Sequence, residues 1–326
     1  MSMKPSIHSG RVNRIIPVKG RPTCAFTLTE LLVVIGTLAV LVMLLVPALA
    51  GTKTDTWRLQ CQNNLKQLQV GFQLFAQDHS DTFPPAGWSS SLTGPTYQMA
   101  WDCWINRYIG GNLPDSVLTS GVVFVGQGNQ VLSIEVCPAD TFPKVNWIGG
   151  NSPWFALRSY AMNAVGPTLG TGFQVNDQNR TYPLPDLSKP IMHGVGIYWT
   201  DTGSGSTPDW NAPGYKTSVV RDPAGTILLC ENTHGQQIVG NIWTCVCIGP
   251  QGSGSDLVQI DRSTNPTQDP NSANAVNQGV LLYQAHQNTF NYAFHDGHVA
   301  ALSIQQTIGS GTLAAPRGMW TVIPGD

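Results

Sequence analysis

An unbroken apolar run and a helical stripe follow one another near the start of the chain. Residues 26–50 contain one charged side chain, Glu30, and as a helix would extend over about 37 Å at roughly 1.5 Å per residue. A bilayer core is about 30 Å thick, so this run is long enough to cross a membrane. It leads into an amphipathic stripe with apolar positions at spacings of three and four: Trp57, Cys61, Leu65, Leu68, Phe72 and Phe75.

The helical pattern ends at Pro84 and Pro85, because proline cannot continue a helix. We therefore expect a helix over residues 26–78, with a transmembrane part at 26–50 and an amphipathic continuation at 51–79.

Shorter apolar runs, typical of strands, follow between long loops at 165–190 and 249–278. The expected strands are 121–125, 131–137, 159–165, 225–231, 241–248, 289–294 and 298–304. The dipeptide Asp296-Gly297 lies between the last two, and it predicts a two-residue hairpin turn because it accepts positive φ at both positions. No repeat or linker divides the rest. The pattern predicts an α+β fold with a long N-terminal helix packed on an antiparallel sheet, residues 80–326 forming one β-rich domain.

The distribution of charge changes this picture. Residues 1–25 carry five basic side chains and no acid, although the whole chain has a net charge of −2. Removing these five from the 17 basic residues leaves 12 against 19 acidic ones, which disfavours binding to nucleic acid. Basic residues before a span place the N-terminus in the cytoplasm. We expect a single-pass protein of the inner membrane with a periplasmic or extracellular domain.

The cysteines leave several pairings open. Cys24 precedes the apolar run and is not placed as a lipoprotein cysteine, which follows its run. The other six cysteines permit fifteen disulfide arrangements, and sequence cannot choose among them. No paired Cys-x-x-Cys motifs occur, which disfavours a structural zinc site.

Three fates compete for the apolar segment. A plain signal anchor leaves Glu30 without a purpose, since a charge at the centre of a span costs about 2.5–3.5 kcal/mol. A secretory signal peptide would be cut after Ala48-Leu49-Ala50 and would release a chain starting at Gly51. Its apolar core is usually about 7–15 residues, shorter than this one. The third fate is a cut between Ala25 and Phe26.

The third fate follows from a resemblance. The stretch AFTLTELLVVIGTLAVLVMLLVPALA (25–50) resembles the processing and methylation motif of type IV prepilins and type II secretion pseudopilins. It has a basic leader (1–25), a small residue, Phe26, and a glutamate as the fifth residue after the cut. Ala25 stands where glycine is usual, and Thr29 where isoleucine is common. The resemblance implies cleavage by prepilin peptidase, N-methylation of Phe26, pairing of Glu30 with the terminal ammonium of a neighbouring subunit, and a helix bend at Pro47.

A second resemblance covers the rest of the chain. His286 is followed after nine residues by Asp296 and Gly297, as in the C-terminal motif of a bacterial family of prepilin-like proteins. Further matching segments are CQNNLKQL (61–68), TFPPAG (82–87), VCPAD (136–140), SYAMN (159–163) and GTILLCE (225–231).

The sequence contains few residues in patterns that could form a metal or catalytic site. His295 and His298 would face each other across the turn, but a packed or exposed structural role is favoured over metal ligation. A Ca²⁺ site at Asp256, Asp261 and Asp269 lacks a regular ligand pattern, so a solvated loop is favoured and no cofactor is expected. No phosphate loop, nucleophile elbow or His-Glu-x-x-His motif occurs, and we expect no enzyme.

The expected function is therefore a structural subunit of a type II secretion pseudopilus or a type IV pilus. Its partners would be prepilin peptidase, identical or related subunits and the inner-membrane assembly platform. The alternative is an anchored or secreted surface binding protein, with some of the ten tryptophans stacking on glycans.

Overall fold

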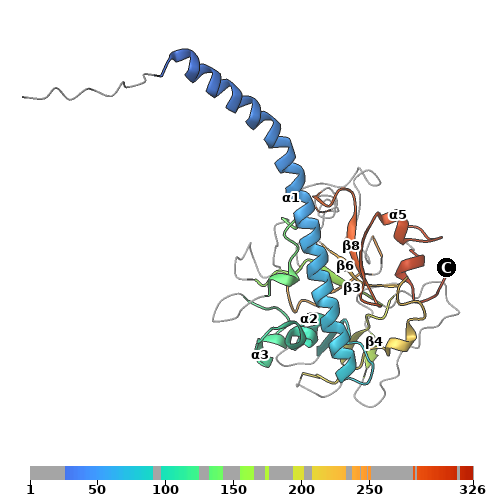
Figure 1. The fold of residues 1–326 in the computed structure, drawn as a ribbon. Helices are drawn as coiled ribbons and strands as arrows, with labels where there is room; N and C mark the ends of the chain where they lie inside the picture. The colour runs from blue at the N-terminus through green and yellow to red at the C-terminus, as the bar shows by residue number, and fades with distance from the viewer. Residues whose placement is uncertain are drawn as a thin grey trace, which may run out of the picture. The chain divides into compact units, whose positions relative to one another are not determined.

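The computed structural model describes residues 26–90, 97–124, 132–141, 155–164, 173–175, 194–201, 208–232, 237–242, 244–247, 249–250, 282, 285–313 and 316–325 (Figure 1). The chain divides into two compact units, Met1–Ala50 and Gly51–Asp326. Ala25 and the possible Ca²⁺ ligands Asp256, Asp261 and Asp269 lie outside the described residues.

Helix α1 (Leu28–Asp78) contributes to both units. It begins with a capping box: the Glu30 carboxylate accepts a hydrogen bond from the Thr27 backbone N–H at 2.9 Å, and the Glu30 N–H donates to the Thr27 hydroxyl at 3.2 Å. Every described side chain from Phe26 to Leu44 is exposed. Within the part of the chain that the structure describes, no helix is long and apolar enough to cross a membrane.

In the second unit, α1 buries the stripe that the sequence predicts. Five of its six members are buried and Trp57 is half-buried against them; the five are Cys61, Leu65, Leu68, Phe72 and Phe75. The Tyr160 hydroxyl donates to the Cys61 carbonyl at 3.4 Å, and the Gln73 amide donates to the His295 carbonyl at 2.9 Å. These bonds tie α1 to a five-stranded sheet.

The five-stranded sheet has the order β7-β3-β6-β8-β9. Its strands are β3 (Tyr160–Asn163), β6 (Ile227–Glu231), β7 (Val246–Cys247), β8 (Phe290–Phe294) and β9 (Val299–Leu302). All pairs are antiparallel except β3 and β7. The residues of β3, β6 and β8 are all buried, so both faces of these strands are covered. Each of the five lies inside a predicted strand.

A four-stranded sheet was not expected from the sequence. Its order is β2-β1-β5-β4, with β1 (Gly87–Ser90), β2 (Gln98–Ala100), β4 (Phe173–Val175) and β5 (Tyr198–Asp201). β5 runs parallel to both β1 and β4, and only β1 and β2 pair antiparallel. The α+β class is confirmed, while the expectation of an antiparallel sheet holds only in part, because both sheets contain parallel pairs.

Two predicted strands are also wrong. The described part of 131–137 forms the 3₁₀ turn η2 (Ser133–Glu135), and the described part of 121–125 is a bend with an isolated bridge between Phe124 and Phe155. The other short helices are α2 (Trp101–Ile105), η1 (Asn106–Ile109), α3 (Asp115–Leu118), η3 (Thr217–Val219), α5 (Ile304–Thr307) and η4 (Gly318–Trp320).

The β8–β9 hairpin has a different turn from the one expected. The Gly297 N–H donates to the Phe294 carbonyl at 3.0 Å, and the Phe294 N–H donates to the His298 carbonyl at 3.0 Å. The loop therefore has three residues rather than two. Only Gly297, with φ of 97°, is in the left-handed region, and Asp296 is not. A three-residue loop needs positive φ only at its last position, which explains the difference.

Candidate functional site

Four residues from distant parts of the chain meet in one buried cluster. Cys61 on α1 forms a disulfide with Cys137, with the Cα atoms 5.0 Å apart. Glu231 at the end of β6 and His286 before β8 complete the cluster. None of the four has exposed surface, and one ligand atom from each lies within 4.8 Å of the others. We call this group the Cys-Glu-His cluster.

The imidazole of His286 bridges the disulfide and the carboxylate. Its Nε2 lies 3.5 Å from Cys137 Sγ, and its Nδ1 lies 3.1 Å from Glu231 Oε2. Glu231 also accepts hydrogen bonds from the Asn291 backbone N–H at 2.7 Å and from the Asn291 amide at 2.9 Å. The amide nitrogen of Asn291 is 3.2 Å from the same Nδ1. A carboxylate is the strongest acceptor here, so Nδ1 donates to Glu231, and Nε2 is the ring nitrogen that faces the sulfur.

Local backbone geometry places His286 in this position. Its N–H donates to the Leu282 carbonyl at 2.9 Å, and its carbonyl accepts from the Thr289 hydroxyl at 2.7 Å. Gln287 and Asn288 then adopt positive φ of 58° and 63°, which turns the chain sharply into β8. Asn291 enters the cluster from that strand.

The cluster gives the predicted motif residue His286 a physical role. Three other segments of the family resemblance supply its neighbours: 61–68 supplies Cys61, 136–140 supplies Cys137 and 225–231 supplies Glu231. Sequence reasoning missed the disulfide pairing and the part of Glu231. The sequence did contain a hint of this arrangement, since both cysteines and the glutamate lie inside segments of the family resemblance. The disulfide of the cluster joins Cys61 of α1 to Cys137 within the second unit.

The other two histidines near the motif, His295 and His298, lie in different environments. His295 is buried with its ring 5.0 Å from that of Phe83, and among the described residues neither ring nitrogen has a hydrogen-bond partner. Burial lowers the pKa of His295 to about 3, so the ring is neutral. His298 is partly exposed: it stacks on Phe294 at 4.2 Å, and its Nδ1 lies 2.6 Å from the Asp296 carboxylate. The two rings pack on different neighbours.

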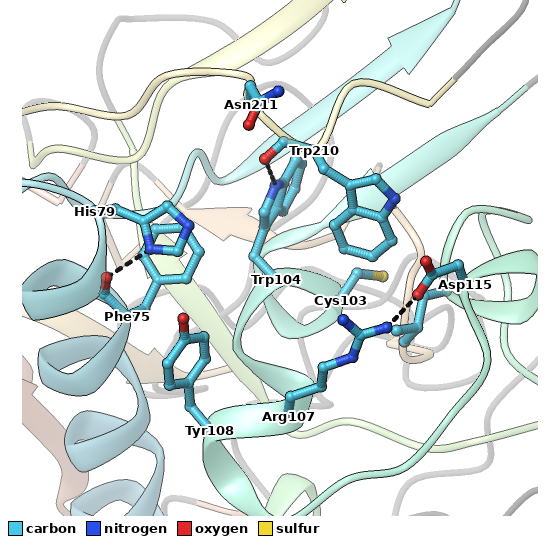
Figure 2. A pocket seen from close by; sticks show the side chains of 10 residues that line it. Phe75, His79, Cys103, Trp104, Arg107, Tyr108, Asp115, Trp210 and Asn211 are labelled. Carbon is cyan, nitrogen blue, oxygen red and sulfur yellow. Dashed lines mark hydrogen bonds and ion pairs between the residues drawn. The ribbon is translucent and has the colours of Figure 1, made fainter.

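A pocket of about 340 Å³ lies elsewhere in the second unit, and Figure 2 shows the side chains that line it. Five rings form much of its wall: Phe75, His79, Trp104, Tyr108 and Trp210. Arg107 and Asp115 make an ion pair at 2.5 Å on another side, both largely exposed. The pocket thus offers flat apolar faces next to hydrogen-bonding groups.

Cys103 and Tyr108 of this pocket are poor nucleophiles. Burial raises the pKa of the Cys103 thiol well above its usual range, with a further contribution from the neighbouring Asp102. Burial also raises the pKa of Tyr108, whose hydroxyl donates to the Asp78 carboxylate at 3.0 Å. Both groups therefore stay protonated near neutral pH, and the pocket is suited to stacking and hydrogen bonding.

A second buried polar network lies near Cys103. Arg158 forms an ion pair with Asp102, and both side chains have no exposed surface. The guanidinium also donates to the Gln237 side chain at 2.9 Å and to the Asn241 carbonyl at 3.0 Å. Burial and the charge of Asp102 raise the pKa of the nearby Glu135 carboxyl well above its usual range. Sequence reasoning did not single out any of these residues.

Comparison of the chain with protein-family models, with curated proteins and with solved structures found no match.

Proposed function

We propose that this protein is a pilin-like subunit that polymerises through its N-terminal helix in a type II secretion pseudopilus or a type IV pilus. Its role is structural rather than catalytic. The fold would be pilin-like, with residues 26–50 as an inner-membrane span and the outer domain carried on the amphipathic half of the helix.

The observation that carries this proposal is the contrast between the two halves of α1. In the second unit one face of the helix is buried, as expected for a helix packed on its own domain. From Phe26 to Leu44, the large apolar side chains are exposed all round the helix, with exposed fractions between 44% and 78%. A helix that is apolar on every side needs lipid or other apolar helices around it. A membrane supplies the lipid before assembly, and the core of a filament supplies the other apolar helices after it.

The motif around Ala25 and Phe26 supports the same proposal, and it names the processing enzyme as prepilin peptidase. Glu30 lies one turn into α1 and would meet the methylated ammonium of a neighbour's Phe26. Pairing of opposite charges is what makes a carboxylate tolerable in a low-dielectric environment. The assembly platform of the inner membrane would insert the processed subunit.

Mass spectrometry of the N-terminal peptide tests the proposal. The full chain is produced in a host with a prepilin peptidase, and we expect a mature terminus at Phe26 carrying an N-methyl group. The matched control is Ala25→Leu, whose bulk should block the cut and leave the leader attached. A terminus at Gly51 would release a secreted protein and exclude filament assembly through this helix.

The pocket favours a second candidate, a surface protein that binds saccharides. The partly exposed rings of Tyr108 and Trp210 near the Arg107–Asp115 pair combine stacking faces with polar groups, as sugar recognition requires. Binding of the full chain to an oligosaccharide array, lost in Trp210→Ala and retained in Phe124→Ala, would support it. Phe124 is a suitable control because it is an exposed aromatic residue that does not line the pocket.

A further inference from the structure

We propose that the dithiol form of this chain binds one zinc ion through Cys61 Sγ, Cys137 Sγ and His286 Nε2. Glu231 would hold the imidazole from its far side, and a water molecule would take the fourth position. The metal and the disulfide are alternative occupants of the same buried cluster. This proposal does not depend on filament assembly.

The distances within the cluster match the edges of a zinc tetrahedron. Zn–S bonds of about 2.3 Å and Zn–N bonds of about 2.0–2.1 Å place sulfur and nitrogen roughly 3.6 Å apart. His286 Nε2 is 3.5 Å from Cys137 Sγ. Two thiolates on one zinc ion would be roughly 3.8 Å apart, and the two Cα atoms, 5.0 Å apart, permit this by rotation of the side chains once the S–S bond is open.

The surroundings of His286 are those of a metal-bound histidine. Such a ligand usually donates its second N–H to a carboxylate, which fixes the tautomer and leaves the other nitrogen free for the metal. Here Glu231 accepts from Nδ1 at 3.1 Å, and two hydrogen bonds from Asn291 hold that carboxylate in place. A structural disulfide has no need of this arrangement.

Burial favours a bound metal over two free thiolates. Two bare thiolates would be costly in a cluster with no exposed surface, but a divalent cation neutralises both. Zinc binding would release the two thiol protons to solvent. Metal bound before oxidation would also keep Cys61 next to Cys137 and away from the four other buried thiols, which are Cys103, Cys230, Cys245 and Cys247.

The exchange between the two forms is a two-electron step. A small-molecule dithiol or a protein dithiol gives two electrons to the Cys61–Cys137 bond and becomes a disulfide. Its two protons pass to the two cysteines. The reverse reaction, with a disulfide as oxidant, closes Cys61–Cys137 and expels the metal.

The test uses the full chain in detergent, with and without reduction by a dithiol under anaerobic conditions, followed by removal of the reductant. We expect one equivalent of zinc by elemental analysis in the reduced protein and none in the oxidised one. Cobalt(II) in place of zinc should give a thiolate-to-metal charge-transfer band. Failure of the reduced wild type to bind zinc would overturn the proposal, and it requires no variant to fold.

Three variants identify the ligands. Cys137→Ser should abolish the cobalt band, whereas Cys103→Ser, a buried cysteine outside the cluster, should leave it unchanged. Glu231→Gln should weaken zinc affinity by about 10–100-fold, because it removes the charge that orients the imidazole. Zinc binding of unchanged affinity in a folded Cys137→Ser protein would show that the metal lies elsewhere and would refute the assignment.

Discussion

The carboxylate of Asp102 and the guanidinium of Arg158 pair in the interior of the second unit, and neither side chain has exposed surface. The Arg158 guanidinium also lies over the ring of Trp101, with its carbon 5.5 Å from the ring centroid. The Gly240 N–H donates to both oxygens of Asp102 at 3.2 Å. The pair therefore joins α2 to the segments around residues 158 and 240.

Removing one member of this pair should be strongly destabilising. Arg158→Met leaves the Asp102 carboxylate buried without its partner, and we expect a loss of about 3–5 kcal/mol in the free energy of unfolding. The double variant Arg158→Met/Asp102→Leu should recover much of that loss, because no charge remains buried. Chemical denaturation measures both. With Asp102→Leu as the second single variant, losses that add up in the double variant would mean that the pair is not coupled.

The free energy of unfolding of the second unit should depend on pH through His295. Burial lowers the folded-state pKa of His295 from 6.5 to about 3, so the unfolded chain takes up its proton first as the pH falls. The stabilisation is complete above pH 6.5 and is lost towards pH 3, at up to about 1.4 kcal/mol per pH unit. His295→Leu should flatten the slope between pH 6.5 and 5 in denaturation experiments. An unchanged slope in a folded His295→Leu protein would contradict this explanation.

Gly297 should matter for its backbone conformation alone. Its φ is 97°, and a Cβ added there would meet nothing closer than Gln69 Cγ at 4.0 Å. We expect Gly297→Ala to cost about 1–2 kcal/mol and Gly297→Val more, since L-residues with side chains avoid positive φ. Gly297→Asn should be milder, because asparagine tolerates this region. Thermal unfolding separates the three, and a harmless valine would contradict the explanation.

Glu30 should be required for assembly because of its charge. The structure shows a second use for its side chain, the capping box with Thr27, so a loss of function in Glu30→Leu alone would be ambiguous. Glu30→Gln keeps an oxygen for the cap and removes the charge. We expect both variants to be cut correctly. A loss of about 1.4 kcal/mol in the free energy of assembly is a tenfold change in the equilibrium, so we expect either variant to enter filaments roughly tenfold less or worse.

The measurement is the amount of protein in sheared filaments, with N-terminal mass spectrometry as the control for processing. Normal incorporation of Glu30→Gln together with poor incorporation of Glu30→Leu would assign the acid to the helix cap and refute charge pairing.

The sequence was informative where one periodicity extends over many residues. The stripe from Cys61 to Phe75 covers four helical turns, and its burial follows from spacing alone. The strands of the five-stranded sheet were found because each is a compact apolar run. β1, β2, β4 and β5 contain no compact apolar run, and β5 pairs with β1 from a distant part of the chain.

The candidate site was harder to predict for a different reason. Pairing of Cys61 with Cys137 depends on tertiary contacts, and six cysteines give no local hint of it. Charged residues are rarely fully buried, so nothing marked Asp102, Arg158 or Glu231 as interior groups. His286 was identified by its motif, while its partners became visible only in the fold.

The bond between Cys61 and Cys137 also determines how the second unit would respond to a pulling force. A force applied along α1 reaches Cys61 and passes through the sulfur atoms directly to Cys137, bypassing the segment between them. The two cysteines are 76 positions apart, so this segment is a hidden length of roughly 260 Å at about 3.3–3.6 Å per residue. While the bond is intact the segment bears no tension. Once it is reduced, the same force would extend this segment, and the chain would lengthen under load.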